Sequence, residues 1–180
     1  METNQMKGIN RIELDNGLVL LTEKRPNTKK AALLSGVRVG SAHEDDRLNG
    51  GSHFNEHLLF KSNRYRSARQ ITEDLEYSGA VINAYTTWKY TAFSAKVPHK
   101  ELPKAVEILF QAATNFSYNR DEFETERQVI QTEIQNFINS PGRYSLTGLF
   151  IPKLFKGTPL ERKVEGTTKA MGSVEKEELE

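Results

Sequence analysis

Residues 120–139 constrain the fold more than any other part of this sequence, because they place carboxylates on the apolar face of a predicted helix. At 100° per residue, one face of that helix is an apolar stripe, made of Phe123, Val129, Ile130, Ile134 and Phe137. Glu126 and Glu133 lie inside the same stripe, two turns apart. A carboxylate buried among apolar side chains costs several kcal/mol unless it is paired or metal-bound. The fold must therefore bring partners to both glutamates.

Two kinds of partner can satisfy these glutamates. The first is an arginine or lysine elsewhere in the chain, which would form an ion pair. The second is a metal ion, with Glu133 as a direct ligand and Glu126 orienting another ligand. Glu122 and Glu124 need no such explanation, since the helix dipole favours negative charge in the first turn. The metal alternative requires further ligands from a separate helix.

The segment His53-Phe54-Asn55-Glu56-His57 offers such ligands. It lies in a predicted helix over 48–61, where residues four apart share a face, so both imidazoles can reach one ion. Glu56 lies on that face too, close enough to contact a metal-bound water. Two histidines and a carboxylate with one open position form a catalytic zinc site, and this order inverts the commoner H-E-x-x-H arrangement. A polar helix face, or one core histidine satisfied by hydrogen bonds, fits the pentapeptide as well.

The predicted strands and helices occur in groups rather than in strict alternation. Asn16-Gly17 is the strongest short hairpin signal, and Ser67 with Gln70 forms a capping box that starts a helix. Strands grouped with runs of helices predict an α+β fold, with an antiparallel-rich mixed sheet and helices packed on it. The predicted strands are 12–15, 18–23, 31–39, 80–85 and 90–97, and the predicted helices are 48–61, 67–77, 102–113, 120–139 and 144–154.

The chain after the helix at 120–139 is predicted to be less regular. Ser140-Pro141-Gly142 ends that helix. Residues 157–180 form a polar tail, whose charge run at 175–180 is typical of a solvated helix face or a frayed end. We therefore expect a single domain over 1–180, with a tail at 157–180 that is partly mobile.

Charge and composition narrow the choice of partners. The chain has 180 residues and a net charge of +1, so no strong field favours nucleic acid or an anionic membrane. The sequence contains no run of 18 apolar residues and therefore predicts no transmembrane helix. Its first residues lack the apolar stretch of a signal peptide. The absence of cysteine excludes disulfides and thiolate metal sites. We expect a cytoplasmic protein that binds neither nucleic acid nor membrane.

Three motifs follow one another along the chain. They are Gly51-Ser-His53-Phe-Asn-Glu56-His57-Leu-Leu-Phe60-Lys, Asn83-Ala84-Tyr85-Thr86, and Glu126-Arg127-Gln-Val-Ile-Gln-Thr-Glu133-Ile. In this order they resemble the N-terminal catalytic part of the pitrilysin, insulysin and mitochondrial processing peptidase family. The similarity runs from about Arg11 to the last residue.

The resemblance implies a role for each matching residue of the metal site. His53, His57 and Glu133 match the ligands of one zinc ion per chain, although manganese or cobalt would suit the same ligands. Glu56 matches the general base that activates the zinc-bound water. Glu126 matches a glutamate that supports the metal site.

The resemblance also implies a strand that binds substrate. Asn83 and Ala84 match the edge-strand segment that pairs with an extended peptide, and an ordinary strand exit is the alternative. Asn55 departs from the family, in which an apolar residue is usual at this position. That position lies on the helix side away from the zinc.

These features together predict a zinc-dependent endopeptidase that hydrolyses extended or unfolded peptides. The fold would be a processing-peptidase-like half domain, and an incomplete one. Family subunits usually have a second half of similar fold, and pairs of halves close around the substrate. We therefore expect a second-half protease subunit or a homo-oligomer as partner. The alternatives are a non-catalytic peptide-binding subunit, against which the intact His53, Glu56, His57 and Glu133 argue, and an inert fragment of a longer protease.

Overall fold

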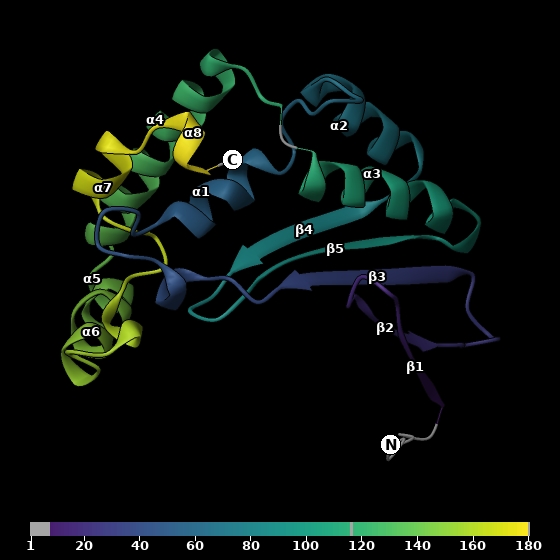
Figure 1. The fold of residues 1–180 in the computed structure, drawn as a ribbon, viewed down its shortest axis with the longest axis horizontal. Helices are drawn as coiled ribbons and strands as arrows, with labels where there is room; N and C mark the ends of the chain where they lie inside the picture. The colour runs from purple at the N-terminus through teal and green to yellow at the C-terminus, as the bar shows by residue number, and fades with distance from the viewer. Residues whose placement is uncertain (1–7, 116, 180) are drawn as a thin grey trace. The chain divides into compact units, whose positions relative to one another are not determined.

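The computed structural model describes residues 8–115 and 117–179 and divides the chain into two compact units, 1–30 and 31–180 (Figure 1). The smaller unit contains an antiparallel hairpin of β1 (Ile9–Glu13) and β2 (Val19–Glu23), with Ile9 opposite Glu23. The hairpin predicted around Asn16-Gly17 is therefore confirmed. The single domain expected over 1–180 stays a prediction.

Gly17 shapes the turn of this hairpin. Its φ of 83° is left-handed, a conformation that glycine adopts without steric cost. The Gly17 amide donates to the Leu14 carbonyl at 2.8 Å, and the Leu14 amide donates to the Leu18 carbonyl at 2.9 Å. Asp15, Asn16 and Gly17 therefore form a three-residue turn with glycine at its left-handed position, not a two-residue Asn-Gly turn.

The larger unit contains a three-stranded sheet in the order β3-β5-β4. The strands are β3 (Lys30–Val37), β4 (Val81–Thr86) and β5 (Thr91–Pro98). β4 and β5 are antiparallel, and their register places Thr86 directly opposite Thr91. Within the described residues β4 therefore lies at the edge of this sheet, and β5 lies at its centre.

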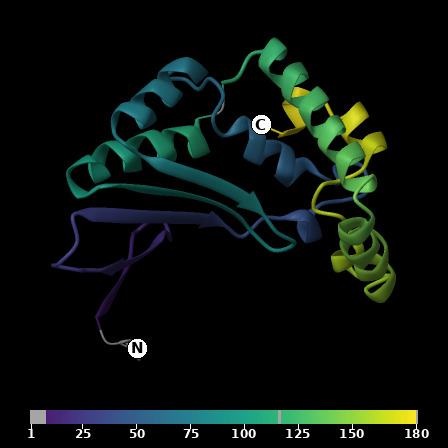
Figure 2. The same ribbon diagram turned by 180° about the vertical axis from the view of Figure 1, so that it is seen from behind.

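Three helices pack on this sheet (Figures 1 and 2). They are α1 (Gly51–Leu58), α2 (Ala68–Tyr77) and α3 (Leu102–Thr114). The predicted capping box starts α2, since the Gln70 amide donates to Ser67 Oγ at 3.3 Å. Helix α1 begins later than the predicted 48–61, because Gly50 has a left-handed φ of 105° that cannot continue a helix, and it ends at Leu58. The α+β fold with helices on an antiparallel sheet is thus confirmed.

A second layer forms around α4 (Arg120–Ile138), which packs against α1 and against α7 (Thr168–Ser173). The Asn119 side chain caps α4 by accepting a hydrogen bond from the Glu122 amide at 2.8 Å. The buried side chains of this core include Phe54, Leu58, Phe123, Ile130, Ile134, Ala170, Met171 and Val174. This core joins the two helices that contain the candidate metal ligands.

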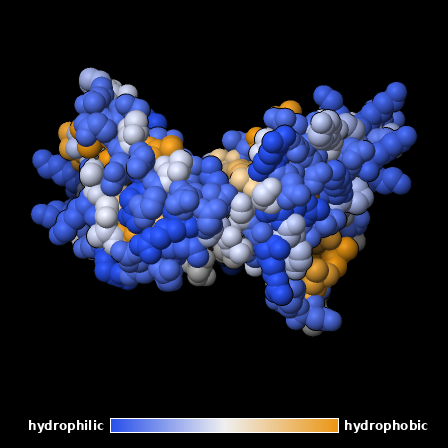
Figure 3. Space-filling model, turned by 90° about the horizontal axis from the view of Figure 1, so that it is seen from above, coloured by the Kyte–Doolittle hydropathy of each residue, from blue (hydrophilic) through white to orange (hydrophobic). Residues whose placement is uncertain are grey.

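The chain resumes a helical course immediately after α4. Pro141 suits the first turn of a helix, where its missing amide hydrogen is not needed. It starts α5 (Pro141–Arg143), which leads into a π-helix (Tyr144–Phe150) and α6 (Ile151–Leu154). The exposed apolar side chains here are Leu146, Leu149, Phe150 and Leu154. On the face shown in Figure 3, hydrophobic patches are separated by a largely hydrophilic surface.

The polar tail predicted for 157–180 stays a prediction, but some of its described residues belong to the core. Met171 in α7 is 0% exposed and Val174 is 1% exposed, so both belong to the core. Leu179 in α8 (Lys176–Leu179) is buried as well. Arg127 of α4, itself buried, donates hydrogen bonds to the Met171 carbonyl at 2.6 Å and the Val174 carbonyl at 2.7 Å. The partial mobility of this segment stays a prediction. Across residues 8–115 and 117–179, no helix has the length and apolar character that crossing a bilayer needs.

Candidate metal centre

Glu44 anchors the first turn of α1, the helix that presents both histidines. Its carboxylate accepts hydrogen bonds from the amides of Gly50 and Ser52, each at 2.7 Å, and from Asn49 Nδ2 at 3.1 Å. Amides at a helix N-terminus lack partners within the helix, and negative charge there suits the helix dipole. Sequence analysis missed Glu44, because it lies in a loop before the helix and no capping pattern identifies it.

Burial of one side of α1 turns its histidines toward α4. Phe54 stacks on Phe123 of α4, with ring centroids 4.8 Å apart. Leu58, one turn further along α1, is 1% exposed. Because Phe54 and Leu58 each follow a histidine directly, packing them against α4 places His53 and His57 beside that helix.

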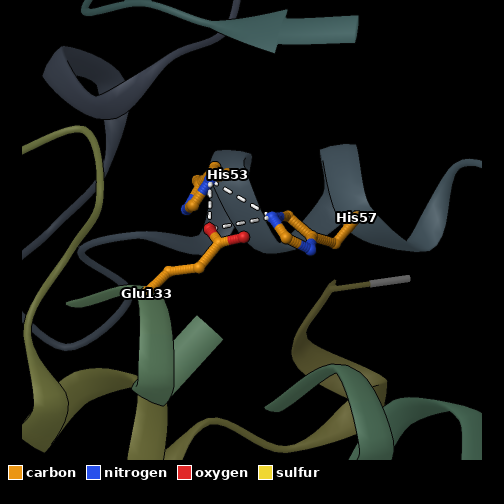
Figure 4. Close-up of side chains that lie close together, drawn as sticks. All are labelled: His53, His57 and Glu133. Atoms are coloured by element: carbon orange, nitrogen blue, oxygen red, sulfur yellow. Dashed lines mark hydrogen bonds and ion pairs between the residues drawn. The ribbon is translucent and has the colours of Figure 1, made fainter. Parts of the chain in front are cut away.

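Glu133 of α4 meets both histidines (Figure 4). Its Oε2 atom lies 3.4 Å from His57 Nε2 and 3.7 Å from His53 Nε2, and the two Nε2 atoms are 3.3 Å apart. Among the described residues, these three form the one cluster of at least three potential metal ligands with donor atoms all within 4.8 Å of one another. The structure therefore brings together the three residues predicted to bind the metal.

The donor set and its spacing fit zinc. Zinc binds imidazole nitrogen and carboxylate oxygen at about 2.0–2.2 Å, so two ligands of a tetrahedral ion lie roughly 3.4 Å apart. The separations of 3.3, 3.4 and 3.7 Å agree with that value. Three protein ligands leave a fourth position open, as in catalytic rather than structural zinc sites. The three side chains could therefore hold one zinc ion beside a water or a substrate atom.

Glu126 has both kinds of partner that the sequence allowed. Its Oε1 atom lies 2.6 Å from Lys61 Nζ, and its Oε2 atom lies 3.1 Å from His57 Nδ1. Because the Glu126 side chain is only 9% exposed, the lysine charge compensates the buried carboxylate. If His57 donates its Nδ1 hydrogen to Glu126, Nε2 carries a free lone pair. That lone pair faces the space shared with the other two ligands, where a metal ion would bind. Glu126 is thus both ion-paired and placed to orient His57.

Glu133 is far more exposed than Glu126, which corrects the stripe predicted for α4. The Glu133 side chain is 46% exposed, and Val129, also assigned to the stripe, is 39% exposed. At 100° per residue the centre of the buried face lies between Phe123 and Ile130, while Glu133 and Val129 lie beyond its margin. The cost of burying a carboxylate therefore applies to Glu126 and not to Glu133.

Glu56 is not one of the three clustered residues and has a contact of its own. Its Oε2 atom accepts a hydrogen bond from Thr86 Oγ1 at 2.6 Å. Thr86 is the last residue of β4, so this bond joins the helix of the histidines to the edge strand. The role of Glu56 as general base stays a prediction.

Asn83 and Ala84 lie in the middle of β4, opposite Ser94 and Phe93 of β5. Asn83 is exposed and Ala84 is partly buried beneath the helices. The predicted edge position of this segment agrees with the strand order of the described sheet. Its function in binding a peptide stays a prediction.

Burial keeps His53 uncharged when no metal is bound. Burial first, and then the charges of His57 and Arg143, together lower the pKa of His53 from 6.5 to about 4. His53 Nδ1 is buried and has no hydrogen-bond partner in the described part of the chain. Neutral imidazole is the form that binds metal ions, so His53 is ready to act as a ligand at neutral pH.

The fold and the site define a class: an α+β protein in which two histidines of one helix and a glutamate of another could hold a single metal ion. The chain belongs to the insulinase family, peptidase family M16, whose family profile matches residues 19–168. The resemblance seen in the three sequence motifs is thereby confirmed.

Curated relatives are similar over nearly the whole chain. Cytochrome b-c1 complex subunit 1 of Bos taurus mitochondria is 34% identical, over 93% of this chain and 34% of that protein. A probable mitochondrial-processing peptidase subunit beta of Schizosaccharomyces pombe is 34% identical, over 92% of this chain and 36% of its own length. An uncharacterized zinc protease of Streptomyces coelicolor is 32% identical, again over 92% and 36%. The chain thus spans about a third of the length of these relatives.

Solved structures confirm the fold. A protease from Helicobacter pylori superposes with a TM-score of 0.88 at 24% sequence identity. The match covers 95% of this chain and 41% of that one. The structural likeness therefore extends over the part that holds the candidate metal centre.

Proposed function

We propose that this chain is the metal-binding part of a zinc-dependent endopeptidase that hydrolyses extended or unfolded peptides. The observation that supports this most directly is the convergence of His53, His57 and Glu133, whose donor atoms are 3.3–3.7 Å apart. Membership of the M16 family and a relative named as a zinc protease support the peptidase class and the choice of metal.

In this proposal each residue of the site has a separate task. His53, His57 and Glu133 would hold the ion, which when bound supplies a water of lowered pKa and polarises the scissile carbonyl. Glu56 takes a proton from the attacking water and delivers it to the leaving amine. Glu126 keeps the proton of His57 on Nδ1, so that Nε2 serves as the ligand atom.

The edge strand supplies the substrate site of this proposal. A peptide that adds to β4 forms main-chain hydrogen bonds beside Asn83 and Ala84. Such pairing requires an extended backbone, which favours unfolded or short substrates. Thr86 ends the same strand and contacts Glu56, so a peptide on β4 would run toward the proposed base.

A second wall around the substrate is part of the proposal. A peptide on β4 would be covered by this chain on one side only, and closure around a substrate fixes its orientation and strengthens electrostatic interactions. Two of the relatives are named as subunits. We therefore propose that a second-half subunit, or a second copy of this chain, faces the site.

Zinc content and cleavage, measured on Glu56→Gln, test the proposed chemistry. We expect this variant to keep about one zinc per chain and to lose turnover by about 10²- to 10⁴-fold, because the proton acceptor is gone while the ligands remain. Glu76→Gln, at an exposed position of α2, is the matched control. Retained cleavage by Glu56→Gln would refute the assigned base. Absence of zinc from the unaltered chain would favour a binding-only subunit or an inert fragment.

A size-resolved activity assay tests the need for a partner. We expect peptidase activity to follow an assembly that contains this chain, with a higher kcat than the isolated chain. Full activity in a fraction that contains single chains only would contradict the second wall.

A further inference from the structure

Thr86 lies where the edge strand meets the helix that contains Glu56. It is the last residue of β4, and its side chain is partly buried toward α1. Two oxygens of α1 lie near its hydroxyl: Glu56 Oε2 at 2.6 Å and the Ser52 carbonyl at 3.4 Å. A threonine hydroxyl has one hydrogen to donate. The shorter contact is to the carboxylate, so the hydrogen is assigned to Glu56.

A hydrogen bond from a hydroxyl to a carboxylate is among the stronger ones in proteins, with typical lengths of about 2.5–2.7 Å. The contact between Thr86 and Glu56 falls in this range. It fixes one oxygen of a side chain that otherwise has three rotatable bonds. The second carboxylate oxygen, Oε1, is then presented in a defined direction.

We propose that Thr86 is a positioning residue for Glu56. This inference rests on the proposed function, since it gives the general base a fixed orientation relative to the strand that would bind the peptide. Because Thr86 belongs to β4, the substrate backbone and the base are located by the same strand. A base held in this way needs less reorganisation in the transition state.

The competing explanation is a structural one. Thr86 could merely join β4 to α1, through Glu56 or through the Ser52 carbonyl, so that its loss would loosen the whole site. The two explanations differ in what changes: a positioning role affects kcat alone, whereas a loosened site affects zinc content, KM and kcat together.

Thr91 offers a matched control. It is the cross-strand partner of Thr86, and its hydroxyl donates to the Val39 carbonyl at 2.9 Å. Thr91→Val therefore removes a hydrogen-bonded hydroxyl from the same end of the same sheet without touching Glu56. Thr86→Val removes the hydroxyl with little change in shape, and Thr86→Ser keeps it.

The experiment compares these three variants in the assembly that shows activity, by zinc content, KM and kcat. We expect Thr86→Val to lower kcat by about 10- to 100-fold, the range for a hydrogen bond to a charged group, with zinc content and KM unchanged. Thr86→Ser should restore kcat to within a few-fold, and Thr91→Val should leave all three quantities unchanged. Equal losses in Thr86→Val and Thr91→Val, or a loss that Thr86→Ser does not rescue, would overturn the proposal.

A crystal structure of Thr86→Val gives a measurement that does not depend on activity. We expect the Glu56 carboxylate to leave its present position while the cluster of His53, His57 and Glu133 stays intact. An unmoved Glu56 would overturn the positioning role. If the unaltered protein held no zinc or cleaved no peptide, the proposed function would fail, yet this structure would still show whether Thr86 positions Glu56.

Discussion

The helices of the metal centre and the hairpin of β1 and β2 differ in where their apolar side chains lie. Around the metal centre, Phe54, Ile130 and Met171 are each 0% exposed. In the hairpin, Ile12 is 47% exposed and Leu21 is 60% exposed. The hairpin is the richer of the two regions in leucine, isoleucine and valine, so composition alone does not account for the difference.

The contrast shows which part of the molecule has a core of its own. Helix α1 packs against the sheet and against α4, and α4 packs against α1 and α7. A close-packed core of this kind transmits small shifts directly to the side chains it supports. Two strands alone have no core, and an isolated two-stranded hairpin is marginally stable in water. The candidate metal ligands are thus held by packing within the larger unit, whereas β1 and β2 are joined to each other by the hydrogen bonds of their ladder.

Replacing Glu133 should have the largest effect on the metal centre. Zinc binds four-ligand structural sites with about 10–16 kcal/mol, or roughly 3 kcal/mol per ligand. Glu133→Gln should therefore weaken zinc binding by about 10²- to 10³-fold, as measured by competition with a chelator. Asp121→Asn, in the exposed first turn of the same helix, is the control. Unchanged zinc affinity in Glu133→Gln would show that the third ligand is another group.

Truncating a core side chain beneath the site should have the largest effect on the free energy of unfolding. Ile130 is fully buried between the glutamates of α4. Ile130→Ala should lower the free energy of unfolding by about 2–5 kcal/mol, since lost burial and a residual cavity add. Urea unfolding of the metal-free chain measures it. A loss below about 1 kcal/mol would mean that this core is not close-packed in solution, and the contrast with the hairpin would disappear.

Regular local patterns were the part of the fold that sequence predicted well. The capping box of Ser67 and Gln70 and the helix at 120–139 depend on neighbours within a few residues, and both are found where they were expected. The turn at Asn16-Gly17 was predicted, but its length was not, because Asp15 also belongs to it. Helix α1 begins later than predicted, because only the folded chain shows the left-handed φ of Gly50.

The sequence indicated the candidate metal ligands but not the residues that hold them in place. Spacing on α1 and the resemblance together indicated His53, His57 and Glu133, which do converge. Glu44, Thr86 and the pairing of Lys61 with Glu126 depend on contacts between distant parts of the chain. Periodicity within one helix contains no information about such contacts. The exposure of Glu133 was mistaken for the same reason, because it depends on which helices cover α4.

Removing the lysine beside Glu126 should weaken zinc binding by less than removing a ligand. Lys61 Nζ lies 2.6 Å from Glu126 Oε1. Without its charge the buried carboxylate is less favourable, and the orientation of His57 suffers. Lys61→Met should lower zinc affinity by about 10- to 100-fold, the cost typical of lost support for a metal ligand. Lys61→Arg should retain most of the affinity.

Lys104→Met is the control for this lysine, because it also breaks a lysine–carboxylate pair, with Asp74 at 2.8 Å, but at a distance from the metal site. Zinc affinity should not change in this variant. If Lys61→Met bound zinc as the unaltered chain does, Glu126 would orient His57 without help from the lysine.

The smallest change in the free energy of unfolding is expected for a hairpin variant, which tests the comparison between the hairpin and the core. Leu21 is 60% exposed, so Leu21→Ala removes little buried area. The free energy of unfolding should change by no more than about 0.5 kcal/mol, as for most exposed positions. Urea unfolding of Leu21→Ala beside Ile130→Ala in the same buffer gives both values on one scale. A loss in Leu21→Ala that approached that of Ile130→Ala would show that the hairpin side chain is buried in solution. The contrast between the two regions would then disappear, because apolar side chains would be buried in both.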